Sequence, residues 1–283
     1  MMSSVICHMP KVVNSPVLFN SPHSGRLYES RFLMQTQLNW PEIRLSEDCY
    51  VDKLLDGATD FGSILIEATF PRAFVDVNRS FQEMDPTIIK GLKKEPISPR
   101  IAAGLGVIPR VVGNGIEIYK KKITAVEANY RLKNYYFPYH DKLCALIEKT
   151  VQKFGFSILF DFHSMPRNSI QNGRKNTSSL PQIVLGDCFG ASCHPSLVKK
   201  VHNLFVCAGL RVEMNSPFSG GYITKNYGSP RENVHVIQVE IDRSLYINEG
   251  TFKPHKGYKD LKERLAIVIE SLCNLRNLQK LML

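Results

Sequence analysis

The chain lacks the features that mark several classes of protein. Of its 283 residues 43% are hydrophobic, yet no stretch approaches the roughly 18 consecutive apolar residues that a membrane-spanning helix needs. Its seven cysteines are an odd number and include no Cys-X-X-Cys pair, which argues against a disulfide framework and favours reduced thiols. The N-terminus has no charged segment followed by an apolar core, so we expect a cytoplasmic protein without a signal peptide or membrane anchor.

Acidic residues are scarce relative to basic ones. The chain has 26 Asp and Glu against 36 Lys and Arg, a formal net charge of +10. This excess raises the possibility of nucleic-acid binding, but the basic residues occur in short groups such as Lys120-Lys121-Lys122, without interleaved aromatic residues. We therefore expect a solvated basic surface and no nucleic-acid partner, although the charge could help to attract a small anionic substrate.

No internal repeat or low-complexity linker divides the sequence, so we predict a single domain over residues 1–283. Short apolar runs typical of buried strands alternate with helical patterns. This alternation favours an α/β fold with a mixed, mostly parallel sheet flanked by helices. The predicted strands are residues 17–19, 63–66, 74–77, 157–160, 183–185 and 234–241.

The predicted helices begin or end at characteristic residues. Ser46 could cap a helix that begins at the next residue. Residues 123–154 form a long amphipathic region that Pro138 is expected to break or kink. Residues 195–208 begin with proline and are followed by glycine, as helices often are. Apolar residues repeat at helical spacing over 258–283.

Two predicted strands lead to a histidine followed by a serine: Asp161-Phe162-His163-Ser164, and Ser21-Pro22-His23-Ser24. In open α/β sheets, ligands bind beyond the carboxyl ends of the strands, where two such histidines could meet. Two neutral imidazoles, one carboxylate and an open position form the pattern of hydrolytic zinc. We predict a metal site that includes His23 and His163, with Asp161 orienting His163 through its other ring nitrogen.

The third ligand should be a carboxylate that can reach the same strand ends. Asp48 is our choice and Glu47 the alternative, because both lie at the start of the helix expected after Ser46. Acidic residues also favour helix N-termini because of the helix dipole alone. The sequence therefore leaves open which acid binds the metal.

Glu240 is a carboxylate inside an otherwise apolar predicted strand. Such a placement is costly unless the group is paired or functional. Near a metal-bound water it could act as general base and then as acid toward the leaving nitrogen. The alternative is a structural partner for a buried arginine.

Several polar residues could bind the substrate. Arg79, beside Asn78 at a predicted strand end, could hold a carboxylate bidentately. Further candidates for the same pocket are Arg72, Arg110, Thr224 and Tyr227.

Five motifs taken in order resemble the N-formylglutamate amidohydrolase family. They are Ser21-Pro22-His23-Ser24-Gly25; Glu47-Asp48 with Val51-Asp52; Phe70-Pro71-Arg72 leading to Val75-Asp76-Val77-Asn78-Arg79; Asp161-Phe162-His163-Ser164-Met165-Pro166; and His235 through Gln238 to Glu240. The resemblance implies a fold similar to zinc carboxypeptidases and aspartoacylases, and hydrolysis of N-formyl-L-glutamate to formate and L-glutamate in histidine degradation. It also implies one zinc ion on His23, Asp48 and His163, Glu240 as the catalytic acid, and Asn78-Arg79 in the substrate pocket.

The sequence departs from the wider group in one respect. Zinc carboxypeptidases place the first histidine and the acidic ligand close together, whereas Asp48 follows His23 by 25 positions. Two alternatives therefore remain: a related zinc amidase or carboxypeptidase with a different acyl or peptide substrate, and a binding protein that has lost catalysis. The oligomeric state is not indicated.

Overall fold

The structure is a computed structural model that describes residues 3–92, 98–171 and 179–275. The chain groups into two compact units. The first comprises Met1–Ile6, Pro22–Glu47 and Glu67–Leu143, and the second comprises Cys7–Ser21, Asp48–Ile66 and Cys144–Leu283. The single catalytic domain expected over residues 1–283 stays a prediction.

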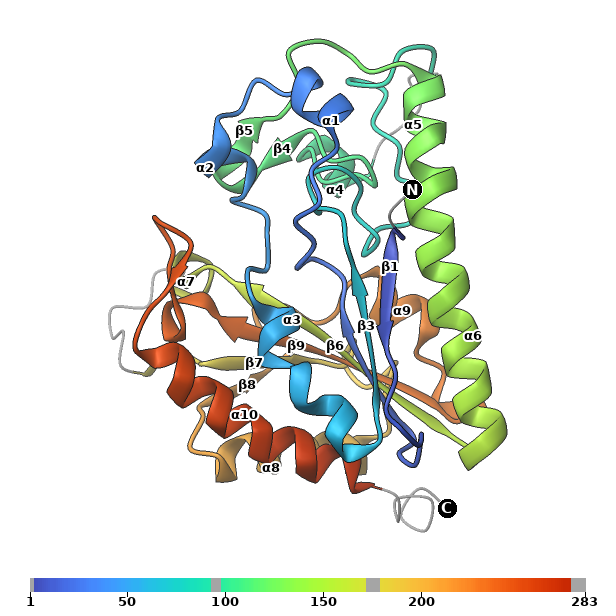
Figure 1. Cartoon of the computed structure of the whole chain (residues 1–283), viewed down its shortest axis with the longest axis vertical. Helices are drawn as coiled ribbons and strands as arrows, with labels where there is room; N and C mark the ends of the chain where they lie inside the picture. The colour runs from blue at the N-terminus through green and yellow to red at the C-terminus, as the bar shows by residue number, and fades with distance from the viewer. Residues whose placement is uncertain (1–2, 93–97, 172–178, 276–283) are drawn as a thin grey trace. The chain divides into compact units, whose positions relative to one another are not determined.

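A seven-stranded sheet has the strand order β1-β3-β2-β6-β9-β7-β8 (Figure 1). β6 runs parallel to both β2 and β9, while β7 is antiparallel to β9 and parallel to β8. The expected α/β fold with a mixed, mostly parallel sheet is confirmed. The strands are Val5–His8 (β1), Val17–Ser21 (β2), Ile64–Ala68 (β3), Ser157–Met165 (β6), Ile183–Gly186 (β7), Val212–Met214 (β8) and Val234–Asp242 (β9).

β6 and β9 are the central strands of the second unit. Both are nine residues long and almost entirely buried, as expected for strands covered on both faces. Their apolar sequences are interrupted by polar residues two positions apart, Asp161 and His163 on β6 and Gln238 and Glu240 on β9. Because side chains alternate along a strand, each pair points to a single face.

Helices pack against this sheet in the second unit. α10 contacts α3, α8 and the 3₁₀ helix η1, α9 contacts β9, and α8 contacts β8 (Figure 1). Among the described residues, no helix is both long enough and apolar enough to cross a membrane. The helices are Ser30–Gln35 (α1), Trp40–Ile43 (α2), Val51–Leu54 (α3), Asp56–Phe61 (η1), Pro99–Ala102 (α4), Ala125–Arg131 (α5), Phe137–Phe154 (α6), Arg167–Gln171 (α7), Pro195–Cys207 (α8), Tyr222–Tyr227 (α9), Arg243–Leu245 (η6) and Gly257–Cys273 (α10).

The first unit is organised around a fully buried arginine, Arg131 on α5. Its guanidinium donates to the Tyr119 hydroxyl at 2.7 Å, the Phe74 carbonyl at 3.0 Å, Gln35 at 2.6 Å and Glu127 at 2.9 Å. It also lies 4.3 Å from the centroid of the Phe74 ring. The charge is tolerated because its donors are matched by acceptors and an aromatic face.

The strand predicted over residues 74–77 was wrong. The Phe74 amide donates to the Pro71 carbonyl, and the Asp76 amide donates to the Val107 carbonyl. These bonds make the segment a succession of turns rather than a member of the sheet. Its apolar residues are buried all the same, which explains why their pattern resembled that of a buried strand.

Two helix predictions also need correction. The helix expected directly after Ser46 begins only at Val51, because Tyr50 has a left-handed backbone with φ of 64°. Pro138 does not break the long helical region. A π-helical turn over Leu132–Tyr136 precedes it, and the proline lies in the first turn of α6, where its missing N–H is tolerated.

Two other helices agree with the sequence. α8 spans Pro195–Cys207, and Gly209 follows it with φ of +77°. α10 confirms the first part of the C-terminal helix, and residues 276–283 of that prediction lie outside the described residues.

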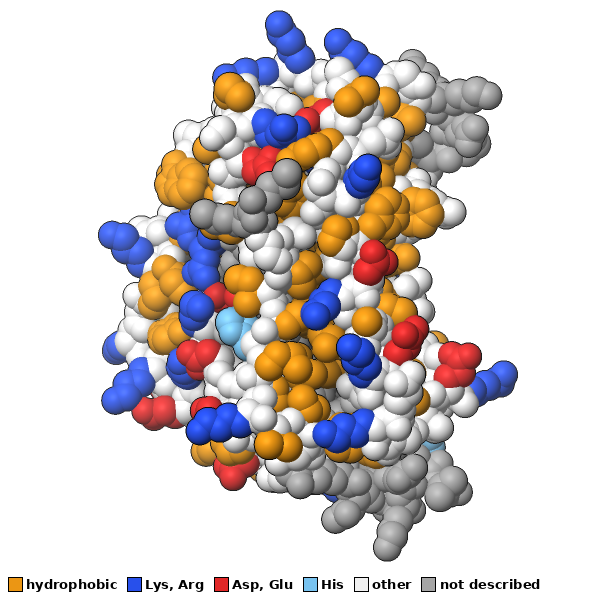
Figure 2. Space-filling view, turned by 45° about the vertical axis from the view of Figure 1, so that its right-hand side comes forward, with side chains coloured by type: hydrophobic (Ala, Val, Ile, Leu, Met, Phe, Trp, Pro, Cys, Tyr) orange, Lys and Arg blue, Asp and Glu red, His pale blue; other side chains and the backbone are white. Residues whose placement is uncertain are grey.

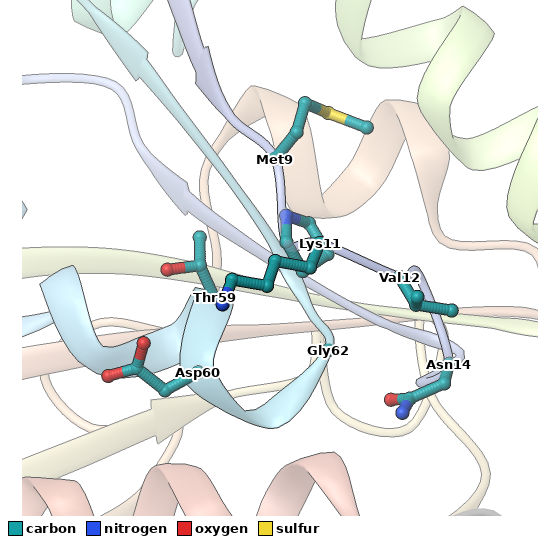
Figure 3. Close-up of a pocket in the computed structure, with 8 residues that line it drawn as sticks. Met9, Lys11, Val12, Asn14, Thr59, Asp60 and Gly62 are labelled. Atoms are coloured by element: carbon teal, nitrogen blue, oxygen red, sulfur yellow. The ribbon is translucent and has the colours of Figure 1, made fainter.

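The surface is basic in many separate places. Figure 2 shows Lys and Arg side chains interspersed with hydrophobic and acidic ones over the displayed face. A hollow in the second unit is lined by residues 9–12, Asn14 and part of η1, and Lys11 extends toward η1 in Figure 3. The residues that line it include none of the predicted site residues.

Candidate active and metal site

Three neighbouring strands of the second unit carry a cluster of buried polar residues. The register pairs Asp161 on β6 with Asn20 on β2 and Gln238 on β9, and pairs His163 with Glu240. Paired residues on adjacent strands point to the same face, so all five side chains project from one face of the sheet. None is more than 9% exposed. Polar groups buried in this way require partners.

His163 has a carboxylate at each ring nitrogen. Its Nε2 lies 3.0 Å from Asp161 Oδ2, and its Nδ1 lies 3.1 Å from Asp48 Oδ2. Burial by itself lowers the pKa of His163, but the charge of Asp161, hydrogen bonds to Asp161 and Asp48, and the charge of Glu240 raise that pKa well above its usual value. The surroundings of His163 therefore stabilise positive charge.

Asp161 is itself fixed by Asn20. The Asn20 amide donates to Asp161 Oδ1 at 2.7 Å, so Oδ2 is the oxygen that faces His163. A proton on Nε2 of His163 satisfies this oxygen and leaves Nδ1 as the nitrogen that can bind a metal. Asp161 thus has the contacts expected of a residue that orients His163.

Asp48 lies in the turn before α3 and uses its two oxygens differently. Oδ1 accepts hydrogen bonds from Arg243 Nη2 at 2.9 Å and Ser164 Oγ at 3.1 Å. Oδ2 faces His163 Nδ1. The carboxylate is therefore anchored through one oxygen and presents the other toward the imidazole.

Glu47, the alternative acidic ligand, has partners within the first unit. Arg44 Nε lies 3.1 Å and 3.0 Å from its two oxygens. The Tyr28 hydroxyl also donates to its Oε1. These contacts hold both oxygens of Glu47 against Arg44 and one of them against Tyr28.

Asp76 organises the predicted site residues of the first unit. Its Oδ1 lies 2.8 Å from His23 Nε2 and accepts from the backbone N–H of Asn78 at 2.8 Å, and its Oδ2 accepts from Arg72 Nε at 2.9 Å. Burial alone raises the pKa of Asp76, but the charges of Arg72, His23 and Arg79 outweigh it and hold that pKa well below its usual value. The ionised carboxylate fixes Nε2 of His23, so Nδ1 is the nitrogen suited to a metal.

The loop that carries His23 depends on a close backbone approach. A Cβ atom on Gly25 would lie 2.1 Å from the carbonyl oxygen of Phe70. The Leu27 amide nearby donates to the Thr69 carbonyl at 2.8 Å. Glycine is therefore required two residues after His23.

Arg79 and Arg110 have different surroundings in the first unit. Arg79 donates through Nε to the Leu105 carbonyl at 3.0 Å and through Nη1 to the Asn78 carbonyl at 2.8 Å, which holds its guanidinium in place. Arg110 donates to the Asp85 carboxylate at 3.2 Å. The structure thus groups Arg72, Asn78 and Arg79 around Asp76, and it pairs Arg110 with a separate acid.

Gln238 connects Glu240 to the turn before α9. Its Oε1 accepts from the Gly221 amide at 2.7 Å, and its Nε2 donates to Glu240 Oε1 at 2.9 Å. Thr224 on α9 is fully buried, and its hydroxyl has no hydrogen-bond partner among the described residues. Tyr227 ends α9 and is partly exposed. Substrate contacts by these two residues stay predictions.

Sequence reasoning missed the roles of Arg243 and Gln238. Arg243 follows the last residue of β9, and Gln238 lies two residues before Glu240 on the same face. The available signals were the charge of Arg243 directly after a buried strand and the polar side chain of Gln238 two positions before Glu240. Neither indicated which side chain would be the partner.

His23 in the first unit, and Asp48 and His163 in the second, are buried residues that each offer an atom able to bind a metal ion. Two imidazole nitrogens and one carboxylate oxygen are the protein ligands of many hydrolytic zinc sites. Each of these histidines has its Nε2 against a buried carboxylate, Asp76 or Asp161, which is how metal-binding histidines are usually oriented. The donor chemistry therefore fits a divalent metal such as zinc.

Comparison with known proteins gives consistent matches. The family model for N-formylglutamate amidohydrolase matches residues 15–247. N-formylglutamate deformylases of Pseudomonas putida and Pseudomonas aeruginosa are each 28% identical over 91% of this chain, which corresponds to 90% and 91% of those proteins. The crystal structure of N-formylglutamate amidohydrolase from Ralstonia eutropha JMP134 has a TM-score of 0.89 and 31% identity, covering 96% of this chain and 98% of that one. A gene product of Agrobacterium tumefaciens shares the fold with a TM-score of 0.68 at 15% identity.

Proposed function

Because the chain belongs to the N-formylglutamate amidohydrolase family, we propose that it hydrolyses the amide bond of N-formyl-L-glutamate to give formate and L-glutamate. Relatives named N-formylglutamate deformylase support this substrate. The observation that carries the proposal is the polar face of the sheet, where His163, its two carboxylate partners and Glu240 are buried together. A cytoplasmic location and a role in histidine degradation belong to the same proposal.

We propose His23, Asp48 and His163 as the ligands of one zinc ion. The donor types, and the carboxylate behind each imidazole, support this assignment. When bound, such an ion would polarise the formyl carbonyl and lower the pKa of a water molecule.

Glu240 is the residue best suited to move the proton. Its carboxylate is buried, and the Gln238 amide holds one of its oxygens at 2.9 Å. As water adds to the formyl carbon, Glu240 accepts a proton from that water. It then donates the proton to the amide nitrogen as the carbon–nitrogen bond breaks, so glutamate leaves with a free amine. The sequence also allowed Glu240 to be the structural partner of a buried arginine, and the buried Arg243 donates to Asp48 and Ser164.

The substrate carries two carboxylates, and arginines are suited to bind them. Arg79 is held rigidly by two backbone carbonyls, next to Asn78 and Arg72. We propose these three residues as the substrate-binding group, with Arg110, Thr224 and Tyr227 as further contacts. The net charge of +10 would favour the approach of such an anion.

A substrate panel tests the proposal. We would compare kcat/KM for N-formyl-L-glutamate, N-acetyl-L-glutamate and a dipeptide with a C-terminal glutamate, using the native enzyme and Glu240→Gln. We expect the formyl compound to be the best substrate. We also expect Glu240→Gln to lower kcat by a factor on the order of 10² to 10⁴, since general acid–base catalysis has that magnitude.

Other outcomes distinguish the alternatives. Faster turnover of the acetyl compound or the dipeptide would favour a related amidase or carboxypeptidase. Binding of N-formylglutamate by calorimetry with no turnover of any compound would indicate a binding protein.

A further inference from the structure

Arg243 and Ser164 both donate hydrogen bonds within a polar network that includes one oxygen of Asp48. Arg243 Nη2 donates to Asp48 Oδ1 at 2.9 Å, and Arg243 Nε donates to Ser164 Oγ at 3.0 Å. Ser164 Oγ in turn donates to the same Asp48 oxygen at 3.1 Å. The Arg243 and Asp48 side chains are only 7% and 2% exposed. Two donors therefore converge on Oδ1 in a site with little access to water.

The elements that carry these residues hold them in place. Ser164 follows His163 on β6, and Arg243 begins η6 directly after β9. The two strands are paired in register from Ser157 to Met165. The network is thus attached to the same two central strands that carry His163 and Glu240.

The ion pair alone does not explain the arrangement. A buried guanidinium and carboxylate often give little net stability, because both lose their hydration. What distinguishes this pair is its asymmetry: both donors bind Oδ1, whereas Oδ2 faces His163 Nδ1 at 3.1 Å. The contacts separate an anchored oxygen from one directed at the proposed metal ligand.

We propose that Arg243, acting with Ser164, positions Asp48 so that it binds the metal through Oδ2 alone. This inference rests on the proposed function, since it takes Asp48 and His163 as ligands of the metal. A carboxylate that bound through both oxygens would occupy one more coordination position. Holding Oδ1 away keeps that position for water and substrate, which a catalytic zinc site requires.

The geometry requires a guanidinium and not merely a positive charge. Arg243 reaches Asp48 and Ser164 from two different nitrogens of one rigid plane. A lysine presents a single ammonium on a flexible chain, so it would keep the charge without spanning both partners. Arg243→Lys should therefore resemble Arg243→Gln more than the native protein.

The test uses the full-length protein loaded with cobalt(II) in place of zinc. Visible absorption of cobalt(II) is intense at four-coordinate sites and weakens as the coordination number rises. We would record it for the native protein, Arg243→Gln, Arg243→Lys and Ser164→Ala, and measure zinc affinity by competition with a chelator. Arg264→Gln is the control, because Arg264 pairs with Asp260 on the exposed face of α10.

We expect weaker cobalt absorption in both Arg243 variants and zinc affinity lower by about 10 to 100-fold, the usual effect of removing a residue that orients a metal ligand. Ser164→Ala should show a smaller change in the same direction, and it keeps the experiment decisive if the Arg243 variants do not fold. Arg264→Gln should match the native protein.

Each contrary outcome has a separate meaning. Native-like absorption and affinity in Ser164→Ala and in folded Arg243 variants would overturn the positioning role and leave the metal site intact. Lower affinity with unchanged absorption would overturn the single-oxygen binding mode. Failure of the native protein to bind any metal would overturn the proposed metal site, and this inference with it.

Discussion

Asp161→Asn is expected to weaken metal binding because it reverses a single hydrogen bond to His163. In the native protein Asp161 accepts from both neighbours, from the Asn20 amide at 2.7 Å through Oδ1 and from His163 Nε2 at 3.0 Å through Oδ2. An amide of the same shape has one acceptor and one donor end. It cannot accept from both neighbours.

The structure determines how the new amide should lie. If its oxygen faces Asn20, its NH₂ donates to Nε2 of His163 and drives the ring proton to Nδ1, the nitrogen that faces Asp48. If its oxygen faces His163, two NH₂ groups meet in a buried site. An unsatisfied buried donor costs about 1 to 3 kcal/mol. Metal binding at Nδ1 requires the second orientation, so this free-energy cost subtracts from the binding free energy. The affinity should therefore fall by roughly 5 to 150-fold.

Zinc affinity measured by chelator competition is the assay, with circular dichroism as the check on folding. Asn20→Ala serves as the matched second change, because without the Asn20 amide the new oxygen can turn toward His163. The double variant Asn20→Ala with Asp161→Asn should therefore bind zinc more tightly than Asp161→Asn alone. Native affinity in Asp161→Asn, or no rescue in the double variant, would refute this reasoning.

Three further predictions concern stability and catalysis. Arg131→Met should lower the free energy of unfolding by about 3 to 5 kcal/mol, because it removes the buried donor to the Glu127 carboxylate and to the oxygens of Phe74, Tyr119 and Gln35; an unchanged urea midpoint would contradict this. Burial, and then the charge of His194, lower the pKa of His235 from 6.5 to about 4. The contribution of neutral His235 to folding stability is therefore complete above pH 6.5, and it is lost as the pH falls toward 4 because the unfolded chain then binds the proton more readily. Urea titrations should show a loss of up to about 3 kcal/mol over this range, and His235→Leu should remove that part of the slope. Gln238→Leu removes the donor to Glu240 and should lower kcat about 5 to 30-fold with little change in KM; a rise in KM alone would argue against a role in positioning Glu240.

The sequence was informative where the residues next to each other along the chain determine the local structure. The long apolar runs that became β6 and β9 predicted buried strands, and the polar residues within them were conspicuous because burial penalises them. Glu240 could be selected on that basis, whereas Asp161 and His163 were selected because they follow the predicted strand 157–160. The structure extends β6 through both residues to Met165. The proline and glycine that bound α8 gave its ends equally well.

The remainder depends on contacts between distant residues. Residues 74–77 are as apolar as a strand, but hydrogen bonds to Pro71 and Val107 fold them into turns. Arg243 follows β9 directly and lies 195 positions from Asp48, which precedes α3, yet the two side chains are hydrogen-bonded. Pro138 suggested a break, but the π-helical turn before it accommodates the proline. No local pattern encodes these partners.

The central claim is that His163 belongs to a metal site on which hydrolysis depends. The most direct test measures zinc content by elemental analysis together with turnover of N-formyl-L-glutamate, in the native protein and in His163→Ala. We predict about one zinc ion per native chain, and loss of both zinc and activity in a folded His163→Ala protein. Full activity in a metal-free His163→Ala variant would contradict the account.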